Sequence, residues 1–240
     1  MSEAPDLFDA ESRALLAART AFGEEGDDGV HRHALGELLT AYERLLRETR
    51  RMVRRSDRAE FEMNQLNQRL QDLTGQLEYR ATHDPLTGVL NRAAIIERSN
   101  RHLASGSLAL IVLDIDHFKR VNDSFGHPVG DTVICGVVDC LKGVAPAVAQ
   151  IGRVGGEEFT ALLPGVSQEV AAQAAEQMRK AIAAHDFALP DRSRVTASFG
   201  VSWQAQGSGF DAAYGSADEA LYQAKRRGRN QVARAALVEA

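Results

Sequence analysis

The feature that most constrains the fold is a long proline-free stretch carrying a seven-residue repeat. No proline occurs between Pro5 and Pro85. From Leu38 onward, mostly apolar positions alternate four and three residues apart, as the core positions of a coiled coil do. These positions are Leu38, Tyr42, Leu45, Thr49, Met52, Ser56, Ala59, Met63, Leu66, Leu70, Leu73 and Leu77. A repeat this regular favours a coiled-coil rod, roughly 60 Å long at about 1.5 Å per residue. The alternative is one amphipathic helix packed on the protein's own globular domain.

The middle of this repeat is weaker than its two ends. Thr49, Ser56 and Ala59 occupy core positions there, and they bury less apolar surface than leucine. The basic run "RRMVRRSDR" in the same region keeps its arginines off the core positions. It therefore indicates a solvated rod surface rather than a membrane-binding patch. We expect that a change of register or twist in this weak segment switches the activity of an attached domain.

A shorter helical segment is expected before the rod, over residues 7–22, followed by the acidic loop "GEEGDDG". Its apolar stripe runs through Leu15 and Leu16, and it either folds back on the rod or meets a partner protein. We divide the chain into a helical segment with its acidic loop (1–34), a coiled-coil stalk for dimerisation and signalling (35–79) and a C-terminal domain (80–240). Residues 1–80 are where a regulatory protein would bind.

The charge and composition exclude several classes of partner. The net charge is -5 and the pI is about 5.8, which argues against a nucleic-acid polymer as ligand. A small phosphate ligand is still compatible with an acidic protein if a metal ion supplies positive charge. Cys135 and Cys140 have neither zinc nor disulfide-framework spacing, so we expect buried, reduced thiols. The acidic start and the lack of a membrane-length apolar run predict a cytoplasmic protein without membrane contact.

After "ATHDPLTG" the sequence alternates between β-prone runs and amphipathic helical segments. Strands are expected at 108–116 and 194–203, with a hairpin at 150–164 between them. Helices are expected near 89–104, 128–142, 167–185 and 215–227. Without the leading helix, the order is strand–helix–strand–strand–helix–strand, which predicts a ferredoxin-like α+β domain.

Two pairs of acidic residues lie at strand ends, one at the end of the first strand and one in the hairpin. "LDID" ends the first strand with Asp114 and Asp116 on one face. In "RVGGEEF", Gly155 and Gly156 suit a two-residue hairpin turn with positive φ, after which Glu157 and Glu158 begin the returning strand. Either pair alone is typical of a solvated surface. If the hairpin lies beside the first strand, Glu157 approaches Asp114, and a hard cation such as Mg²⁺ relieves their repulsion.

Four motifs in order resemble the diguanylate cyclase, or GGDEF-domain, family in its GGEEF form. They are "THDPLTGVLNR", "LDIDHFKRVNDSFGHPVGD", "RVGGEEF" and "ALYQAKRRGRN", and they span about residues 80–235. The resemblance implies a fold similar to adenylyl cyclase and polymerase palm domains. It also implies a nucleotidyltransferase that condenses two GTP molecules into cyclic di-GMP and releases pyrophosphate. Two Mg²⁺ or Mn²⁺ ions would serve each active site, and the active form would be a homodimer held by the stalk.

The same resemblance implies a role for each matching position. Metal ions would be held by Asp114, the backbone carbonyl of Ile115 and Glu157. Glu158 would be the general base, with Glu157 as the alternative. The remaining implied positions would bind GTP. Asn122 and Asp131 would bind the guanine. The phosphates would be bound by the backbone N–H groups of His117, Phe118 and Lys119 and by the side chains of Lys225 and Arg229.

One motif of the family is missing. Many members carry an Arg-x-x-Asp inhibitory product site that ends five residues before the two glycines, whereas residues 146–149 here read "PAVA". We therefore expect product inhibition through that site to be absent or weak. Two other functions stay open on the sequence: a catalytically silent domain that senses GTP or cyclic di-GMP, and a stalk that serves as a partner-docking scaffold.

Overall fold

The structure is a computed structural model that describes residues 8–23 and 28–236. By internal contacts the chain divides into two units, one up to Thr74 and one from Gly75 onward. None of the helices in these described ranges is both long and apolar enough to cross a membrane.

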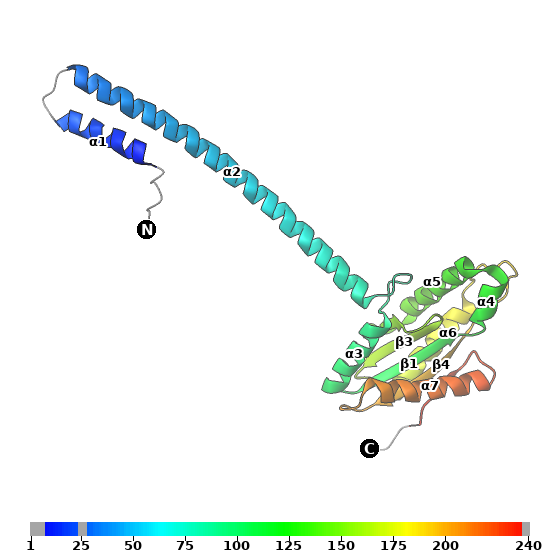
Figure 1. Ribbon diagram of the computed structural model, residues 1–240. Coiled ribbons are helices and arrows are strands. Elements are labelled where there is room, and N and C mark those ends of the chain that lie inside the picture. Colours follow the sequence, from blue (N-terminus) through cyan, green and yellow to red (C-terminus); the bar gives the residue numbers. More distant parts are fainter. Residues whose placement is uncertain (1–7, 24–27, 237–240) are drawn as a thin grey trace, which may run out of the picture. The chain divides into compact units, whose positions relative to one another are not determined.

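The first unit is a helical hairpin. Helix α1 (Asp9–Gly23) runs beside the beginning of α2 (Asp28–Thr82), as Figure 1 shows. Ala34 of α2 is buried, and Arg44 Nε lies 4.0 Å from the Glu11 carboxylate of α1. The segment before the rod therefore folds back on it, which is the first of the two arrangements that the sequence left open. Residues 24–27 of the expected acidic loop lie outside the described residues, and α2 already begins at Asp28.

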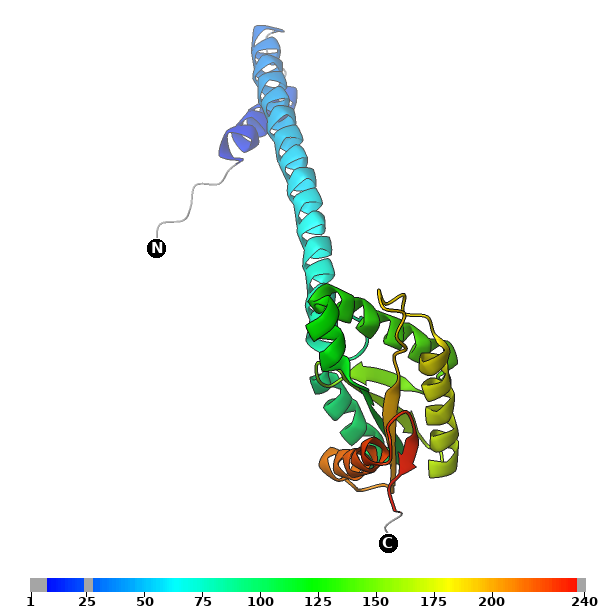
Figure 2. The same cartoon turned by 90° about the vertical axis from the view of Figure 1, so that its right-hand side faces the viewer.

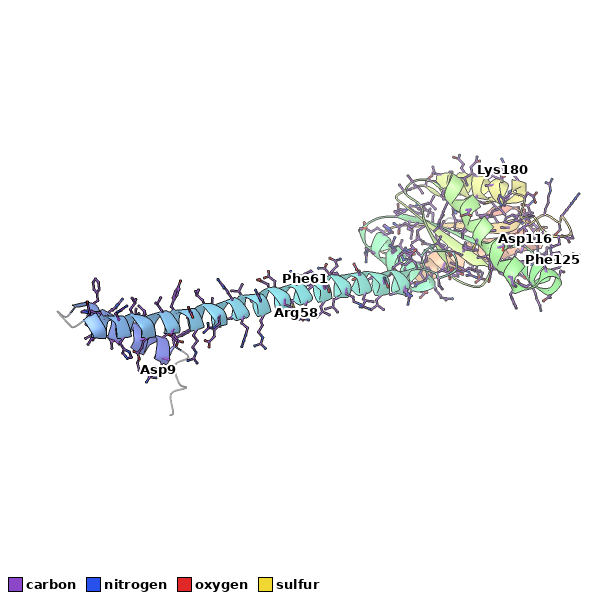
Figure 3. The ribbon with its side chains drawn as sticks, turned by 90° about the horizontal axis from the view of Figure 1, so that it is seen from above. Asp9, Arg58, Phe61, Asp116, Phe125 and Lys180 are labelled. Carbon is purple, nitrogen blue, oxygen red and sulfur yellow. The ribbon has the colours of Figure 1, made fainter. Side chains whose placement is uncertain are left out.

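Helix α2 continues without interruption for 55 residues, which confirms the long helix expected from the proline-free sequence. Its later core positions, Met63, Leu66, Leu70, Leu73 and Leu77, are all exposed. Polar neighbours stabilise the helix locally through pairs four residues apart, such as Arg58 with Glu62. Figure 3 shows Arg58 and Phe61 among the side chains that extend from α2. An exposed apolar stripe along a single helix is what a coiled-coil strand presents before it pairs.

The second unit is an α+β domain built on one five-stranded sheet, which confirms the predicted fold class. Its strands are β1 (Leu108–Ile115), β2 (Gln150–Arg153), β3 (Glu158–Pro164), β4 (Ala197–Gln204) and β5 (Val232–Arg234). The strand order is β2-β3-β1-β4-β5, with β4 and β5 parallel and the other neighbours antiparallel. The first four strands have the ferredoxin-like order. Every residue of β1 is buried, because β1 is central and helices cover both of its faces.

Helices pack on both faces of the sheet, as Figure 2 shows. One face carries α5 (His127–Val144) and α6 (Gln168–Ala184), with Ile111 and Leu113 of β1 in the same apolar cluster. The other face carries α3 (Arg92–Ser105) and α7 (Phe210–Arg226), which pack on Leu110 and Val112. Alternate residues of β1 thus belong to two cores, which explains its uninterrupted apolar sequence.

The structure differs from the expected elements at four places. A separate short helix, α4 (Phe118–Phe125), precedes α5 and is divided from it at Gly126, whose φ is 83°. Helix α7 begins at Phe210 rather than at 215, because Asn100 Oδ1 accepts a hydrogen bond from the Phe210 N–H and so satisfies a helix-start donor. Strand β4 begins at Ala197 rather than at 194, and β5 was not expected at all.

Candidate active site

The predicted acidic residues meet at one end of the sheet. Asp114, at the end of β1, lies directly opposite Glu158 in the β1–β3 register. One residue further on, the Ile115 N–H donates to the Glu157 carbonyl over 3.2 Å. The hairpin that carries the two glutamates therefore lies beside the strand that carries Asp114. The condition on which the sequence-based metal site depended is met.

The tip of this hairpin differs in detail from the expected turn. Strand β3 begins at Glu158, so Glu157 belongs to the turn, and neither Gly155 nor Gly156 has a φ in the left-handed region. Glycine at 155 instead provides space for the Glu158 side chain as it is placed. A Cβ there would lie 2.5 Å from the Glu158 carboxylate and 3.3 Å from its Cβ. The small residue therefore leaves room for the Glu158 side chain.

The site holds several carboxyl groups that are partly shielded from water. Asp114 is only 6% exposed, and burial raises its pKa, although Lys225 opposes this rise by a direct hydrogen bond and by its charge. Burial also raises the pKa of Glu157, and the negative charge of Asp114 raises it further. Both carboxyls therefore hold their protons more tightly than they would in water, and a further cation beside them would favour their ionised forms.

The residues fit a magnesium ion only as part of a larger ligand set. Nowhere in the described ranges do three or more His, Cys, Asp or Glu side chains gather closely enough to hold a metal. The expected ligands are two carboxylates, of Asp114 and Glu157, and the Ile115 carbonyl. All three supply oxygen, which suits Mg²⁺, and Mg²⁺ usually completes its shell with water and substrate phosphates.

Asp116 has a structural role, because hydrogen bonds within the protein occupy its carboxylate. It is buried, and its carboxylate accepts hydrogen bonds from Thr196 Oγ1 at 2.7 Å, Ser198 Oγ at 2.7 Å and the Asn230 N–H at 3.0 Å. Figure 3 marks its place within the domain. The sequence placed Asp114 and Asp116 together as one acidic pair; the structure separates their roles. Asp116 anchors the chain after α7, where Arg229 lies.

The two basic residues reach the site from the end of α7. Lys225 is in the last turn of α7, and its Nζ lies 2.8 Å from Asp114 Oδ1. Arg229 follows the helix with a φ of 64°, a left-handed conformation that is uncommon for a residue other than glycine. Its N–H donates to the Ala224 carbonyl, which holds this conformation at the helix end. The expectation that the pair lies on the last helix or its end is met.

The segment after β1 presents backbone donors. His117 adopts a left-handed conformation with φ of 58°, and α4 then begins at Phe118, whose side chain is buried. No side chain caps this helix start. The N–H groups of a first helical turn lack partners within the helix, so those near Phe118 and Lys119 suit an anionic ligand.

Asn122 provides the most informative polar atom of the domain. Its Oδ1 is buried and has no hydrogen-bond partner among the described residues. A Cβ on Gly130 would collide with this same atom, so glycine at 130 makes room for the amide. Asp131 is the next residue, exposed at the start of α5. A donor from a ligand or from water would satisfy this acceptor.

An ion pair that the sequence did not reveal supports the hairpin tip. Arg153 Nη1 lies 3.2 Å from Asp84 Oδ1, and Arg153 Nη2 donates to the Gly156 carbonyl over 2.6 Å. Burial raises the pKa of Asp84, but hydrogen bonds from Thr87 and Arg153 outweigh this and hold it below its ordinary value. Both residues belong to recognised motifs, yet they are 69 positions apart, and no spacing rule connects them.

Comparisons with known proteins agree with this geometry. Residues 81–231 match the family described as "Diguanylate cyclase, GGDEF domain". The chain is 43% identical over 159 residues to the diguanylate cyclase DgcP of Pseudomonas aeruginosa, an alignment that covers 64% of the chain and 24% of DgcP. The chain thus spans about a quarter of that relative's length.

Two solved structures extend the likeness beyond this domain. The coiled coil and GGDEF domain of DgcB from Caulobacter crescentus, in complex with c-di-GMP, is 32% identical with a TM-score of 0.68, covering 72% of this chain and 96% of that one. Diguanylate cyclase SiaD from Pseudomonas aeruginosa, in complex with its activator SiaC, is 31% identical with a TM-score of 0.63, covering 93% of this chain and 86% of SiaD. Because the family match alone covers more than half of the chain, this protein belongs to the GGDEF-domain family of diguanylate cyclases.

Proposed function

We propose that this chain is a diguanylate cyclase that joins two GTP molecules into cyclic di-GMP and releases two pyrophosphates. In each step the 3′-hydroxyl oxygen of one GTP forms a bond to the α-phosphorus of the other. The bond from that phosphorus to the pyrophosphate oxygen breaks, and the hydroxyl proton passes to a carboxylate. The observation that carries this proposal is the meeting of Asp114 with the Glu157–Glu158 turn at one end of the sheet.

The polar groups of the site suit the parts of GTP. Asn122 Oδ1 would accept a hydrogen bond from the guanine edge, whose N1–H and amino group are donors that adenine does not offer in that arrangement. Asp131 would accept the second. The triphosphate would lie between the backbone donors of residues 117–119 and the side chains of Lys225 and Arg229.

Asp114, the Ile115 carbonyl and Glu157 would hold two Mg²⁺ or Mn²⁺ ions, which supply polarisation of the α-phosphate and a lower pKa for the attacking hydroxyl. Glu158 would take the hydroxyl proton, with Glu157 as the alternative base. Phosphoryl transfer depends mainly on positioning and charge neutralisation. The carboxylates of the site, together with Lys225 and Arg229 at the end of α7, would therefore make most of the protein's contribution to the rate.

The stalk would make the reaction possible by pairing two chains. Each domain holds one GTP, so the product forms only where two loaded domains face each other. Joining two copies through a coiled coil raises the effective concentration of one site near the other to roughly millimolar. DgcB contains a coiled coil and SiaD binds an activator protein. These likenesses support a homodimer with a regulatory partner at residues 1–80, acting in the cytoplasm where GTP is available.

The test uses the purified full-length chain with GTP and Mg²⁺, followed by chromatography for cyclic di-GMP. Wild type is expected to form product, and Glu158→Gln to lose 10²–10⁴-fold in rate, the usual contribution of a general base. If Glu157 is the base, Glu157→Gln shows that loss while Glu158→Gln does not. A chain that binds GTP but forms no product, even as a covalent dimer, would be a sensor and not a cyclase.

A further inference from the structure

The helical hairpin of the first unit has two unlike sides. On one side, a cavity of about 440 Å³ is lined mainly by Leu15, Phe22 and Leu35. A second of about 380 Å³ is lined by Tyr42 and Leu45 among others. The two cavities share Leu15 and Leu38, so they form one apolar groove between α1 and α2.

The opposite side of the same hairpin, here called the polar side, carries many more charged side chains. A cavity of about 810 Å³ lies there, and charged side chains contribute much of its lining. They are Glu11, Arg13, Arg32, His33, Glu37 and Arg44. Water satisfies such a surface, whereas the groove on the other side keeps large apolar side chains in contact with solvent.

Large apolar side chains beside the groove are exposed, as they are along the stalk. Phe22 of α1 is 92% exposed, and Leu35, Leu39 and Tyr42 of α2 are each more than half exposed. The three α2 residues are spaced four and three apart, so they share one stripe. Helix α1 half-covers the neighbouring stripe, through Leu38 and Leu45, and leaves this one open. The helices of the hairpin therefore leave one apolar stripe uncovered.

The open stripe continues into the stalk. Tyr42 begins a series at seven-residue intervals that passes through Thr49 and Ser56 and ends at Leu77. Its members Met63, Leu70 and Leu77 are exposed like Tyr42. In a parallel two-stranded coiled coil, such a position faces its own equivalent in the partner chain. Pairing through Leu70 and Leu77 thus directs Tyr42 toward Tyr42 of the second chain.

We propose that the apolar groove of one chain packs against the groove of a second copy, so that two hairpins form a four-helix bundle at the beginning of the paired stalks. This interface rests on the homodimer of the proposed function and extends it to α1. Two α2 helices supply the shared stripe, and each α1 completes its own side. A second copy fits better than another protein because the stalk seam, which runs directly into the groove, already holds that copy in place.

Crosslinking of the full-length chain, purified alone, tests the interface. In a background with Cys135→Ser and Cys140→Ser, we would introduce Tyr42→Cys in the open stripe, His33→Cys on the polar side and Leu70→Cys in the stalk. Facing equivalents of one seam position come within disulfide range. We expect covalent dimers from Tyr42→Cys and Leu70→Cys, and at least tenfold less from His33→Cys.

The outcomes separate the two levels of the proposal. Dimers from Leu70→Cys without dimers from Tyr42→Cys would overturn the bundle and leave the stalk homodimer intact, with the groove free for another protein. Absence of dimers from both would overturn the homodimer as well. GTP turnover is measured separately and decides the cyclase activity.

Sedimentation of neighbouring substitutions gives a second, independent reading. Leu39→Glu places a charge in the open stripe, whereas Thr40→Glu places the same charge one residue further, among the lining of the polar cavity. We expect the dimer dissociation constant to rise at least tenfold in Leu39→Glu and to change less than twofold in Thr40→Glu, with helical content unchanged in both. Equal dissociation constants for the two variants would contradict the bundle.

Discussion

The ammonium group of Lys225 lies 2.8 Å from Asp114 Oδ1 and joins the end of α7 to the end of β1. The carboxylate expected to hold the metal is thus paired with a lysine of the same chain. A divalent cation that approaches Asp114 meets a positive charge already in place. The triphosphate of GTP would attract that lysine, so metal and nucleotide should bind together more readily than either binds alone.

Replacement of this lysine should therefore separate metal binding from nucleotide binding. In Lys225→Met we expect Mn²⁺ affinity without nucleotide to rise about tenfold, because ~1.4 kcal/mol of charge repulsion is removed. Affinity for GTP should fall by a similar factor. Electron paramagnetic resonance measures free Mn²⁺, and calorimetry measures GTP binding. Arg226→Met, at the next and exposed position, is the matched control. Unchanged Mn²⁺ affinity would show that the ion pair does not control the site.

Glu157 makes stability depend on pH without metal. Burial and the Asp114 charge raise its folded-state pKa above the ordinary value of about 4.5, so the folded protein binds the proton more tightly than the unfolded chain. Stability should then fall as the pH rises from about 4.5 through the raised pKa, and stay at the lower level above it. Glu157→Gln should make this decrease smaller, leaving the part that comes from the raised pKa of Asp114, as measured by urea midpoints across pH 4–8 without metal. Parallel curves for wild type and variant would contradict the raised pKa.

The Arg153–Asp84 pair should matter for both stability and turnover. Both side chains are largely buried. Arg153→Met removes the Arg153 donors to Asp84 and to the Gly156 carbonyl, while Asp84 keeps its hydrogen bonds from Thr87, and the loss should cost about 1–3 kcal/mol of unfolding free energy. Turnover should fall by more than the loss of folded protein accounts for. The hydrogen bond from Arg153 to Gly156 is lost, and Gly156 directly precedes Glu157. Arg153→Lys keeps the charge but loses the forked geometry, so it should recover stability better than turnover. Full turnover in Arg153→Met would show that the tip is positioned by its backbone alone.

Product inhibition should be weak in this chain. Residues 146–149 read Pro-Ala-Val-Ala, which offers neither a guanidinium nor a carboxylate to a cyclic dinucleotide. We expect cyclic di-GMP to inhibit only by competition with GTP, which initial-rate measurements at several GTP concentrations distinguish. Tight non-competitive inhibition that is lost on substitution within 146–149 would refute this expectation.

The register of the stalk should set the rate of the joined domains. Thr49, Ser56 and Ala59 form a weak middle in the repeat, so a change of twist there requires little apolar contact to be broken. Disulfides through Leu66→Cys and through Leu70→Cys fix the seam at two different heptad positions. Turnover should differ several-fold between these two covalent dimers. Equal turnover in both would indicate that the stalk tethers the domains without switching them.

Sequence alone was sufficient wherever a local pattern has one structural meaning. The proline-free heptads from Leu38 to Leu77 predicted a long helix, and the unbroken apolar run before Asp114 predicted a strand. The "LDID" and "GGEE" motifs placed two sets of acids at strand ends. Helix α4 was missed although Phe118, Val121 and Phe125 repeat at helical spacing, because the stretch is short and otherwise polar.

Tertiary structure decided the features that depend on partners far apart in the chain. Asp116 became an anchor because Thr196, Ser198 and Asn230 donate to it, and α7 began early because Asn100 accepts from Phe210. Arg153 forms an ion pair with Asp84, and the short β5 pairs with the edge of β4. Periodicity in a sequence reports which side of an element avoids water. It does not report which distant donor will satisfy a given carboxylate, because that is settled only when the elements pack.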